Sequence, residues 1–404
     1  MGEEVFSHGG LRALQGVIDH HVGEGTVPGV VGLVDCGGET HVFVGGTKAL
    51  GGVDPMTPDT IFRIASMTKP ITAVATMMLV DEGRLQLDDP VDDLLPELAH
   101  RHVLRSLESA LDDVVPAERR ITVEDLLTFR WGMGLPLAPP DRYPIQRAIA
   151  ERGLAGFGPP DPAAPYGPDG YMRRLGELPL MAQPGAEWFY TAGSNVLGVL
   201  VARAADQPFS AFLADRVFAP LGMRDSGFFV ASEEIERFVP AYVAQGQRLA
   251  LHDDARTGGW SRPPAFEAGD AGLVATVGDF LAFSRLLLNG GRHGEERLLS
   301  SDAVAAMQVD RLNEDQRSRG RPILAPGTGW GYGMSVVIDP QAAERPMGCI
   351  GWAGGFGTSW IADPASGLSV ILMTQRLFSD PVLPVIHKAF QDAAFAAVGS
   401  GSTR

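Results

Sequence analysis

The chain has 404 residues, and its 33 Lys and Arg stand against 49 Asp and Glu, which gives a formal net charge of −16. An acidic surface repels phosphate backbones, and no Lys/Arg cluster in the sequence overrides this, so nucleic acid is not expected as a partner. Hydrophobic residues make up 45% of the chain, which suits a globular protein with a large core. The length predicts about two or three structural units.

The first residues and the cysteines bear on the cellular compartment. The opening MGEEV has neither the basic region nor the apolar stretch of a secretory signal. The most apolar windows, such as residues 72–80, are far shorter than the ~20 residues of a membrane-spanning helix. Cys36 and Cys349 lie in strand-like segments, where buried free thiols are expected, although the sequence leaves their pairing open. We therefore predict a soluble, cytoplasmic protein with no membrane partner.

Hydrophobic periodicity and turn residues predict the elements in chain order. A first helix over residues 11–23 precedes two strands, 27–35 and 40–45, which Cys36-Gly37-Gly38 joins as a hairpin. A long helix then runs from about Ser66 to Glu82. The middle of the chain carries mainly helical patterns, at 123–128, 196–205, 209–218 and 277–288. The C-terminal part returns to strands and closes with a helix, at 332–339, 358–362, 368–374 and 382–397.

The arrangement of these elements predicts the domains. Strands at both ends with helices between them indicate an α/β domain formed by residues 1–75 and 327–404, around an inserted, mainly helical domain of residues 76–326. Residues 132–179 differ from the rest of the insert because they are rich in Gly, Pro and aromatic residues. Long irregular segments in compact domains are usually functional, so we predict that this stretch is a lid.

The strongest chemical signal is Ser66 and Lys69 in IASMTKP. Residues three apart at a helix start share a face, so the amine lies within reach of the hydroxyl. A neutral amine can accept the seryl proton, and the backbone N–H of Ser66 at a helix N-terminus can stabilise an oxyanion. The alternative is a capping serine and a solvated lysine. The apolar residues on both sides of the motif argue against it, because they bury the segment.

These residues lie in the stretch FRIASMTKPITA, which resembles the nucleophile helix of the beta-lactamase-related serine hydrolases. This family includes class C beta-lactamases, D-alanyl-D-alanine carboxypeptidases and family VIII carboxylesterases. Similar segments follow in the same order, namely LQLDDPVDDLLPEL, ITVEDLLTFRWGM, PLGM at 220–223 and AGLVAT at 271–276. The resemblance covers about residues 11–395. It implies an α/β plus α fold with an antiparallel sheet flanked by helices, built from both termini around a helical insert.

A second motif, WFYTAGSNVLG, resembles the tyrosine motif of the family. The resemblance implies that Tyr190 moves the proton between Ser66, Lys69 and the leaving group. An isolated tyrosine before a helix would instead be read as core or cap packing. Beta-lactamases carry an Asn two residues after this tyrosine, where it contacts the acylamino group of the substrate. The present chain has Ala192 there, which cannot make that contact, and Asn195 is expected to pack or to bond the backbone.

The third motif of the family, Lys/His-Thr/Ser-Gly, is replaced by GWAGGFGT at residues 351–358. The resemblance puts Trp352 in the place of the cation and Gly354 in the place of the glycine. It also makes the N–H of Gly355 the second oxyanion donor beside that of Ser66. A tryptophan at this position is similar to the family VIII carboxylesterases. Trp131 is a further candidate for the substrate-binding wall, with core packing as its alternative.

Several other signals are absent from the sequence. It contains no Gly-x-Ser-x-Gly elbow, no HExxH and no phosphate-binding glycine loop, so no metal or organic cofactor is expected. We predict a serine carboxylesterase that acts on a small-molecule ester or acyl substrate through a Ser66 acyl-enzyme. The alternatives are an acyltransferase with the same intermediate, a beta-lactamase or D-Ala-D-Ala peptidase, and a non-catalytic binding protein. The natural acyl group, its acceptor and the oligomeric state stay open.

Overall fold

The computed structural model describes residues 5–154, 162 and 164–398. Within these residues, seven antiparallel strands form one sheet in the order β11-β12-β13-β14-β15-β1-β2. Strand β1 pairs with β15 from Val30 opposite Thr374 to Asp35 opposite Ser369, so strands from the two ends of the chain are neighbours in one sheet. The bounds are β1 Gly29–Cys36, β2 Glu39–Gly46, β11 Thr328–Trp330, β12 Ser335–Val337, β13 Ile350–Gly354, β14 Thr358–Asp363 and β15 Leu368–Thr374.

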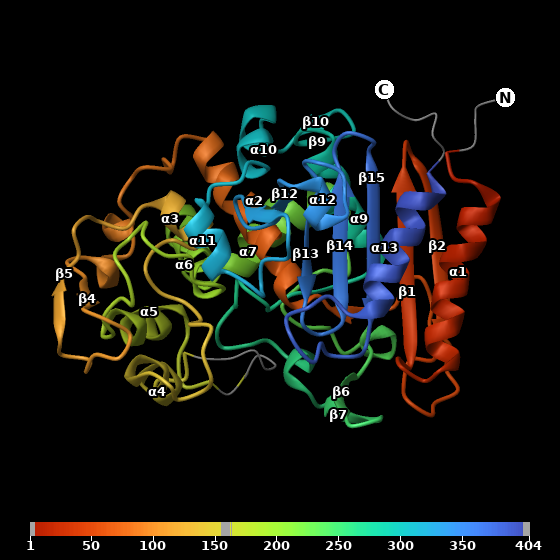
Figure 1. Ribbon diagram of the computed structural model, residues 1–404, viewed down its shortest axis with the longest axis horizontal. Coiled ribbons are helices and arrows are strands. Elements are labelled where there is room, and N and C mark those ends of the chain that lie inside the picture. The colour runs from red at the N-terminus through yellow and green to blue at the C-terminus, as the bar shows by residue number, and fades with distance from the viewer. Residues whose placement is uncertain (1–4, 155–161, 163, 399–404) are drawn as a thin grey trace.

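Alternate side chains of β1 enter two different cores, as the pleat of a strand requires. Val30 and Val34 pack with α1 (His8–Gly23) and α13 (Val385–Ala397). Val31 and Leu33 belong to the main core, together with α9 (Val277–Leu288) and the helical part of the molecule. Gly32 lies on the α13 side, where a Cβ atom would come within 2.6 Å of the Phe390 ring. Helices therefore cover both faces of the sheet (Figure 1).

Most of the remaining helices form the second part of the molecule, which lies at the left in Figure 1, whereas the short α12 lies beside the strands of the sheet. Their bounds are α2 Thr68–Asp81, α3 Val123–Leu127, α4 Pro144–Glu151, α5 Pro168–Gly176, α6 Ala192–Ala205, α7 Phe209–Leu213, α8 Ala219–Leu221, α10 Ser301–Met307, α11 Glu314–Arg319 and α12 Pro340–Ala343. Four short two-stranded sheets are separate from the seven-stranded sheet among the described residues. They are formed by β3 Phe62–Arg63 with β8 Val274–Ala275, β4 His102–Leu104 with β5 Val114–Pro116, β6 Ala241–Gln245 with β7 Arg248–Asp253, and β9 Arg292–His293 with β10 Glu296–Arg297.

The structure confirms the predicted fold class and refines its parts. The predicted hairpin of β1 and β2 and the predicted helix α9 are present. The domain boundary predicted after residue 75 falls inside α2, which runs from Thr68 to Asp81 and is buried along nearly its whole length. Helix α9 lies in the predicted insert, yet it packs on the sheet through β15 and β1. The predicted lid contains α4 and α5, while residues 155–161 and 163 of it lie outside the described residues.

The two cysteines are free and buried. They lie in one row across the neighbouring strands β13, β14, β15 and β1. In this row Cys349 is next to Ile350, which pairs with Ala362. Asp363 pairs with Leu368, and Cys36 is next to Asp35, which pairs with Ser369. Three strand spacings of ~4.8 Å separate them by roughly 14 Å, far beyond the Cα separation of a disulfide. Burial also raises the pKa of the Cys349 thiol to about 12.

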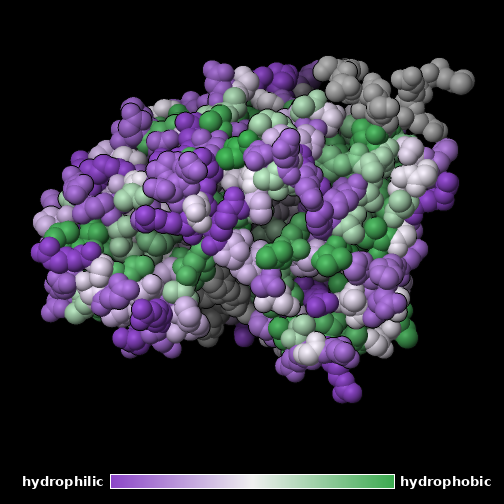
Figure 2. All heavy atoms as spheres, in the orientation of Figure 1, coloured by the Kyte–Doolittle hydropathy of each residue, from purple (hydrophilic) through white to green (hydrophobic). Residues whose placement is uncertain are grey.

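Hydrophilic residues cover most of the face seen in Figure 2, and hydrophobic residues appear there in scattered groups. Among the described residues, no single helix combines the length and apolar character of a membrane span. Helix α6 and the segment Phe209–Leu221 meet those limits only together, with an angle of 80° between them.

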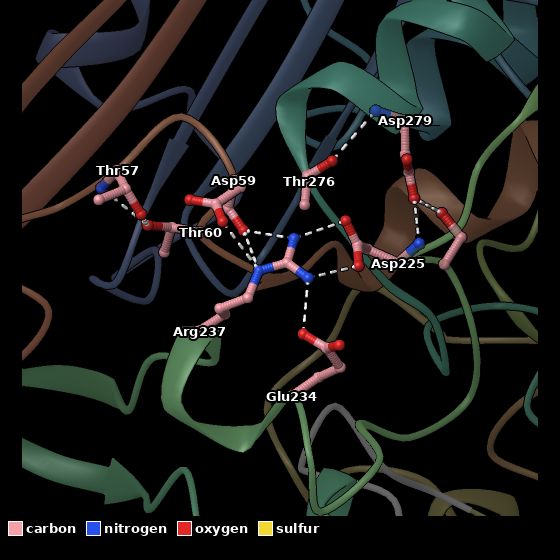
Figure 3. A network of polar contacts seen from close by, with 9 residues as sticks. Thr57, Asp59, Thr60, Asp225, Glu234, Arg237, Thr276 and Asp279 are labelled. Atoms are coloured by element: carbon pink, nitrogen blue, oxygen red, sulfur yellow. Dashed lines mark hydrogen bonds and ion pairs between the residues drawn. The ribbon is translucent and has the colours of Figure 1, made fainter.

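A polar network fixes the segment that leads to the nucleophile (Figure 3). The Arg237 guanidinium donates to Asp225 at 2.7 and 2.6 Å and to Glu234 at 2.8 Å, and it forms an ion pair with Asp59 at 3.1 Å. Asp279, in the first turn of α9, accepts the N–H of Asp225 at 2.9 Å. The network thus connects the chain before β3 to the helix that lies under the sheet. Burial raises the pKa of the Asp279 carboxyl to about 6.

We expect the variant Asp279→Asn to be more stable than the wild type above pH 6. Because its folded-state pKa is raised, the contribution of Asp279 to stability is complete below about pH 4 and is lost as the pH rises through about 6. A rise from 3.8 to about 6 corresponds to about 3 kcal/mol at ~1.36 kcal/mol per pKa unit. Urea unfolding at pH 7.5 and pH 4.5 measures the difference. An equal effect of the substitution at both pH values would contradict this reading.

Candidate active site

Ser66 lies in a single 3-10 turn, Ala65–Met67, directly before α2. The preceding residue, Ala65, has φ of 44°, which is the left-handed region that residues with a Cβ rarely adopt. Such a conformation costs about 1–3 kcal/mol and persists only where the surrounding structure imposes it. Residues 61–65 and 67–70 are buried, whereas Ser66 is partly exposed. The turn therefore presents this one side chain at the surface of a buried segment.

Lys69 is only 1% exposed, and its Nζ has two hydrogen-bond acceptors. It donates to Ser66 Oγ at 3.0 Å and to the backbone carbonyl of Asp270 at 2.7 Å. The same Nζ lies 4.6 Å from the centre of the Tyr190 ring, within the range of a cation–π contact. The structure thus brings together the three side chains that the sequence motifs single out.

Tyr190 stands just before α6 and is nearly buried. Its carbonyl accepts the N–H of Leu135 at 2.9 Å, so the predicted lid begins by pairing with this residue. The next residue, Thr191, has φ of 85° and ψ of −56°. A β-branched residue in that region is strained, at a cost of about 1–3 kcal/mol. Strained backbone next to both Ser66 and Tyr190 is typical of functional sites.

Trp352 comes from β13 and reaches the same phenol. Its indole Nε1–H donates to Tyr190 Oη at 2.8 Å. The ring lies 4.6 Å from Trp330 and 5.5 Å from Tyr190, between ring centres, in an aromatic cluster that also contains Phe129. A direct contact with Tyr190 was not predicted, because the sequence motif indicated only that Trp352 replaces a cation. Trp352 therefore contacts the tyrosine through both its ring and its N–H.

The third motif, on β13 and in the turn after it, packs against the turn that carries Ser66. A Cβ atom at Gly354 would come within 2.2 Å of the Ile64 carbonyl oxygen, so only glycine allows β13 to approach this turn. Thr358 reinforces the contact because its hydroxyl donates to the same carbonyl at 3.2 Å. Gly355 is exposed in the turn after β13, and its carbonyl accepts the N–H of Phe378 at 2.8 Å.

Two predicted substrate-binding residues have different outcomes. Trp131 has no exposed surface and belongs to the main core, so the structure disagrees with its assignment to the substrate-binding wall. A fully buried indole offers no surface to a ligand, and the packing alternative holds. Ala192 is half-buried in the first turn of α6, next to the Tyr190 turn. Asn195 accepts the N–H of Asp270 at 3.1 Å, which confirms the expected bond to the backbone.

Sequence reasoning missed Asp270 and Thr191. The Thr191 hydroxyl donates to the Asp270 carboxylate at 2.8 Å, and Asp270 is only 7% exposed. The sequence carries no signal for this contact, since the two residues are 79 positions apart. The described residues also include no cluster of three His, Cys, Asp or Glu side chains arranged to hold a metal ion.

Comparison with known proteins places this geometry in a family. A family model described as Beta-lactamase matches residues 14–393. The chain belongs to this family. Protein Rv1367c of Mycobacterium tuberculosis is 38% identical over 357 residues, which cover 86% of this chain and 83% of that protein. Esterase EstB of Burkholderia gladioli is 33% identical over 411 residues, which cover 95% of this chain and 94% of the esterase.

A solved structure supports the same assignment. EstCE1, described as a hydrolase with promiscuous acyltransferase activity, matches with a TM-score of 0.80 at 25% identity. The match covers 96% of this chain and 98% of EstCE1. These similarities confirm the predicted resemblance to the beta-lactamase-related serine hydrolases, with esterases among the relatives.

We expect Trp352→Phe to lower kcat for an ester by about 3- to 10-fold, because it removes one hydrogen bond worth ~0.5–1.5 kcal/mol. The phenyl ring keeps most of the packing against Trp330 and Tyr190, so KM should change little. Trp188→Phe is a matched control, since its indole lies 5.8 Å from Tyr190 and its N–H has no partner among the described residues. Steady-state kinetics of both variants decides. An equal loss in the two would assign the effect to packing alone.

Proposed function

We propose that this protein is a serine carboxylesterase that forms an acyl-enzyme on Ser66. The observation that carries the proposal is the continuous set of contacts from Ser66 Oγ to Lys69 Nζ, from Lys69 to the Tyr190 ring, and from Tyr190 Oη to Trp352. A nucleophile next to a proton acceptor that is itself oriented by a third group is the arrangement that covalent catalysis needs. The similarity to Esterase EstB supports the ester as substrate class.

Acylation begins when Ser66 Oγ attacks the ester carbonyl carbon. Its proton passes to the neutral amine of Lys69, which contacts Ser66 Oγ, or to an ionised Tyr190, whose ring contacts Lys69, and the carbonyl oxygen becomes an oxyanion. The N–H groups of Ser66 and Gly355 are the proposed donors to this oxyanion. Collapse of the intermediate breaks the bond to the alcohol oxygen, which receives the same proton and leaves as the neutral alcohol.

Deacylation repeats these steps with water. The proton acceptor, deprotonated again after release of the alcohol, takes a proton from the attacking water. The second tetrahedral intermediate expels Ser66 Oγ, which regains its proton, and the carboxylic acid is released. The Trp352 N–H donates to the Tyr190 oxygen throughout. This contact holds the phenol oxygen in a defined position, and it therefore supports Tyr190 as a participant in the proton transfers.

An acyltransferase is the second candidate, and one observation favours it. EstCE1, the hydrolase with promiscuous acyltransferase activity, shares the fold over nearly the whole chain. An alcohol or amine that takes the place of water would intercept the same acyl-enzyme. Product ratios measured with increasing alcohol concentration separate the two activities. The cytoplasmic location of the protein stays a prediction.

We expect Ser66→Ala to lose both ester turnover and covalent labelling by a fluorophosphonate probe. The substitution removes the attacking oxygen, while the partly exposed site tolerates the smaller side chain, so the thermal midpoint should stay within a few degrees of the wild type. Ser106→Ala, at an exposed serine, is the control and should label normally. Persistent labelling of Ser66→Ala would show that another residue is the nucleophile.

We also expect p-nitrophenyl butyrate to be a better substrate than nitrocefin by kcat/KM. Beta-lactams carry a carboxylate that a cation in the third motif would bind, and the neutral indole of Trp352 cannot replace it. A charge-assisted hydrogen bond is worth about 1.5–3 kcal/mol, so its loss reduces efficiency by roughly 10- to 150-fold. Ala192 removes a further amide contact. A larger kcat/KM for nitrocefin would favour the beta-lactamase alternative.

A further inference from the structure

Asp270 lies in a segment that runs along the nucleophile helix. The Thr72 hydroxyl of α2 donates to the carbonyl of Gly269 at 2.7 Å, and the N–H of Leu273 donates to the Thr68 hydroxyl at 3.2 Å. These bonds are buried, and they hold the backbone on either side of Asp270 against α2. The position of Asp270 relative to Ser66 and Lys69 is therefore fixed by the backbone, independently of its own side chain.

All three polar parts of Asp270 are used at the candidate active site. Its carbonyl accepts Lys69 Nζ at 2.7 Å, and its N–H donates to Asn195 Oδ1 at 3.1 Å. Its carboxylate accepts the hydroxyl of Thr191 at 2.8 Å. One buried residue thus contacts Lys69 on α2 and also two residues in and before the first turn of α6.

The Asp270 carboxylate contacts a residue with a strained backbone conformation. Thr191 has φ of 85° and lies between Tyr190 and α6, so its conformation sets the orientation of the tyrosine relative to this helix. A strained residue holds such a conformation only when its surroundings determine it. A hydrogen bond to an ionised acceptor is about twice as strong as a neutral one, which suits the carboxylate to this task.

We infer that Asp270 is a positioning residue for the proposed esterase reaction. Its carboxylate holds the Thr191 turn and thereby places Tyr190, while its carbonyl holds Lys69, so that one residue sets the distance between the two proton-handling groups. The inference rests on the proposed function, because it gives Tyr190 and Lys69 their roles. The carboxylate itself does not touch the reacting atoms in this assignment.

The test compares two substitutions at Asp270. Asp270→Ala removes the acceptor of the Thr191 hydroxyl and should lower kcat for p-nitrophenyl butyrate by about 10- to 100-fold, with KM changed less than threefold. Asp270→Asn keeps an oxygen that can accept this bond and should recover most of the loss. The backbone carbonyl that holds Lys69 is present in both variants, so the difference between them reports on the side chain.

Thr191→Val tests the other partner of the same contact. It keeps the shape of the side chain but removes the hydroxyl, so it should reproduce the kcat loss of Asp270→Ala. The double variant should be no slower than either single variant, because both remove one interaction. If Asp270→Ala does not fold, Asp270→Asn and Thr191→Val still decide, since the first should retain activity and the second should lose it.

Asp35→Ala is a matched control for the loss of a buried carboxylate. Asp35 is 3% exposed and accepts the Thr40 hydroxyl at 2.7 Å and the Arg285 Nε–H at 3.1 Å. It lies at the Cys36 end of β1, whereas Thr374, whose N–H donates to Gly357, pairs with Val30 at the other end. This variant should lose thermal stability and keep the kcat of the folded protein. The same stability measurement on the Asp270 variants separates unfolding from loss of turnover.

Three results would overturn the inference. They are an unchanged kcat in Asp270→Ala, an Asp270→Asn variant as slow as Asp270→Ala, and losses that multiply in the double variant. Fluorophosphonate labelling of wild-type Ser66 reports on the proposed function alone, because it needs only the nucleophile. A wild type that labels and turns over ester, combined with any of these three results, rejects the role of Asp270 and leaves the esterase assignment intact.

Discussion

The burial of the Lys69 amine is the constraint on which the arrangement of this site depends. A buried polar group must find hydrogen-bond partners inside the protein, because leaving it unpaired costs several kcal/mol, roughly 2–7 by transfer measurements. Lys69 finds them in Ser66 Oγ and the Asp270 carbonyl. Those two acceptors fix the turn before α2 and the segment after residue 268. The ring of Tyr190 closes the third side, so the start of α6 is placed by the same amine.

The sheet and a small aromatic cluster hold the side of the site that carries Gly355. Arg63, two residues before the turn Ala65–Met67, is buried against Phe238 and Trp260 and donates to Asp253 at 2.8 Å. Burial lowers the pKa of Arg63 to about 10. Trp260 donates to the Gly272 carbonyl at 2.7 Å and packs against Phe356, which follows Gly355. One cluster therefore contacts the strand before Ser66, the turn of Gly355 and the segment after Asp270.

Trp352 is the residue on which the proposed preference for uncharged esters rests. In this family the third motif usually offers a cation to the carboxylate of the substrate, and an indole cannot do so. The indole N–H instead donates to Tyr190, while its ring joins an aromatic cluster with Trp330 and Trp188. The replacement puts an indole in place of a cation and adds a contact to the tyrosine, and the proposed preference for an uncharged substrate rests on both changes.

Local patterns in the sequence predicted the order of the elements, the sheet built from both termini and the pair Ser66 and Lys69, because periodicity and a three-residue spacing at a helix start are properties of neighbouring residues. Tyr190 and Trp352 were predicted from the resemblance of their segments to the family motifs. The burial of Trp131, the packing of α9 on the sheet and the role of Asp270 were beyond the reach of these patterns. Lys69 and Asp270 are 201 positions apart, and no pattern in either segment predicts a contact with the other. Only the tertiary structure decides such contacts, because they arise when separate elements pack into one core and must share their buried polar groups.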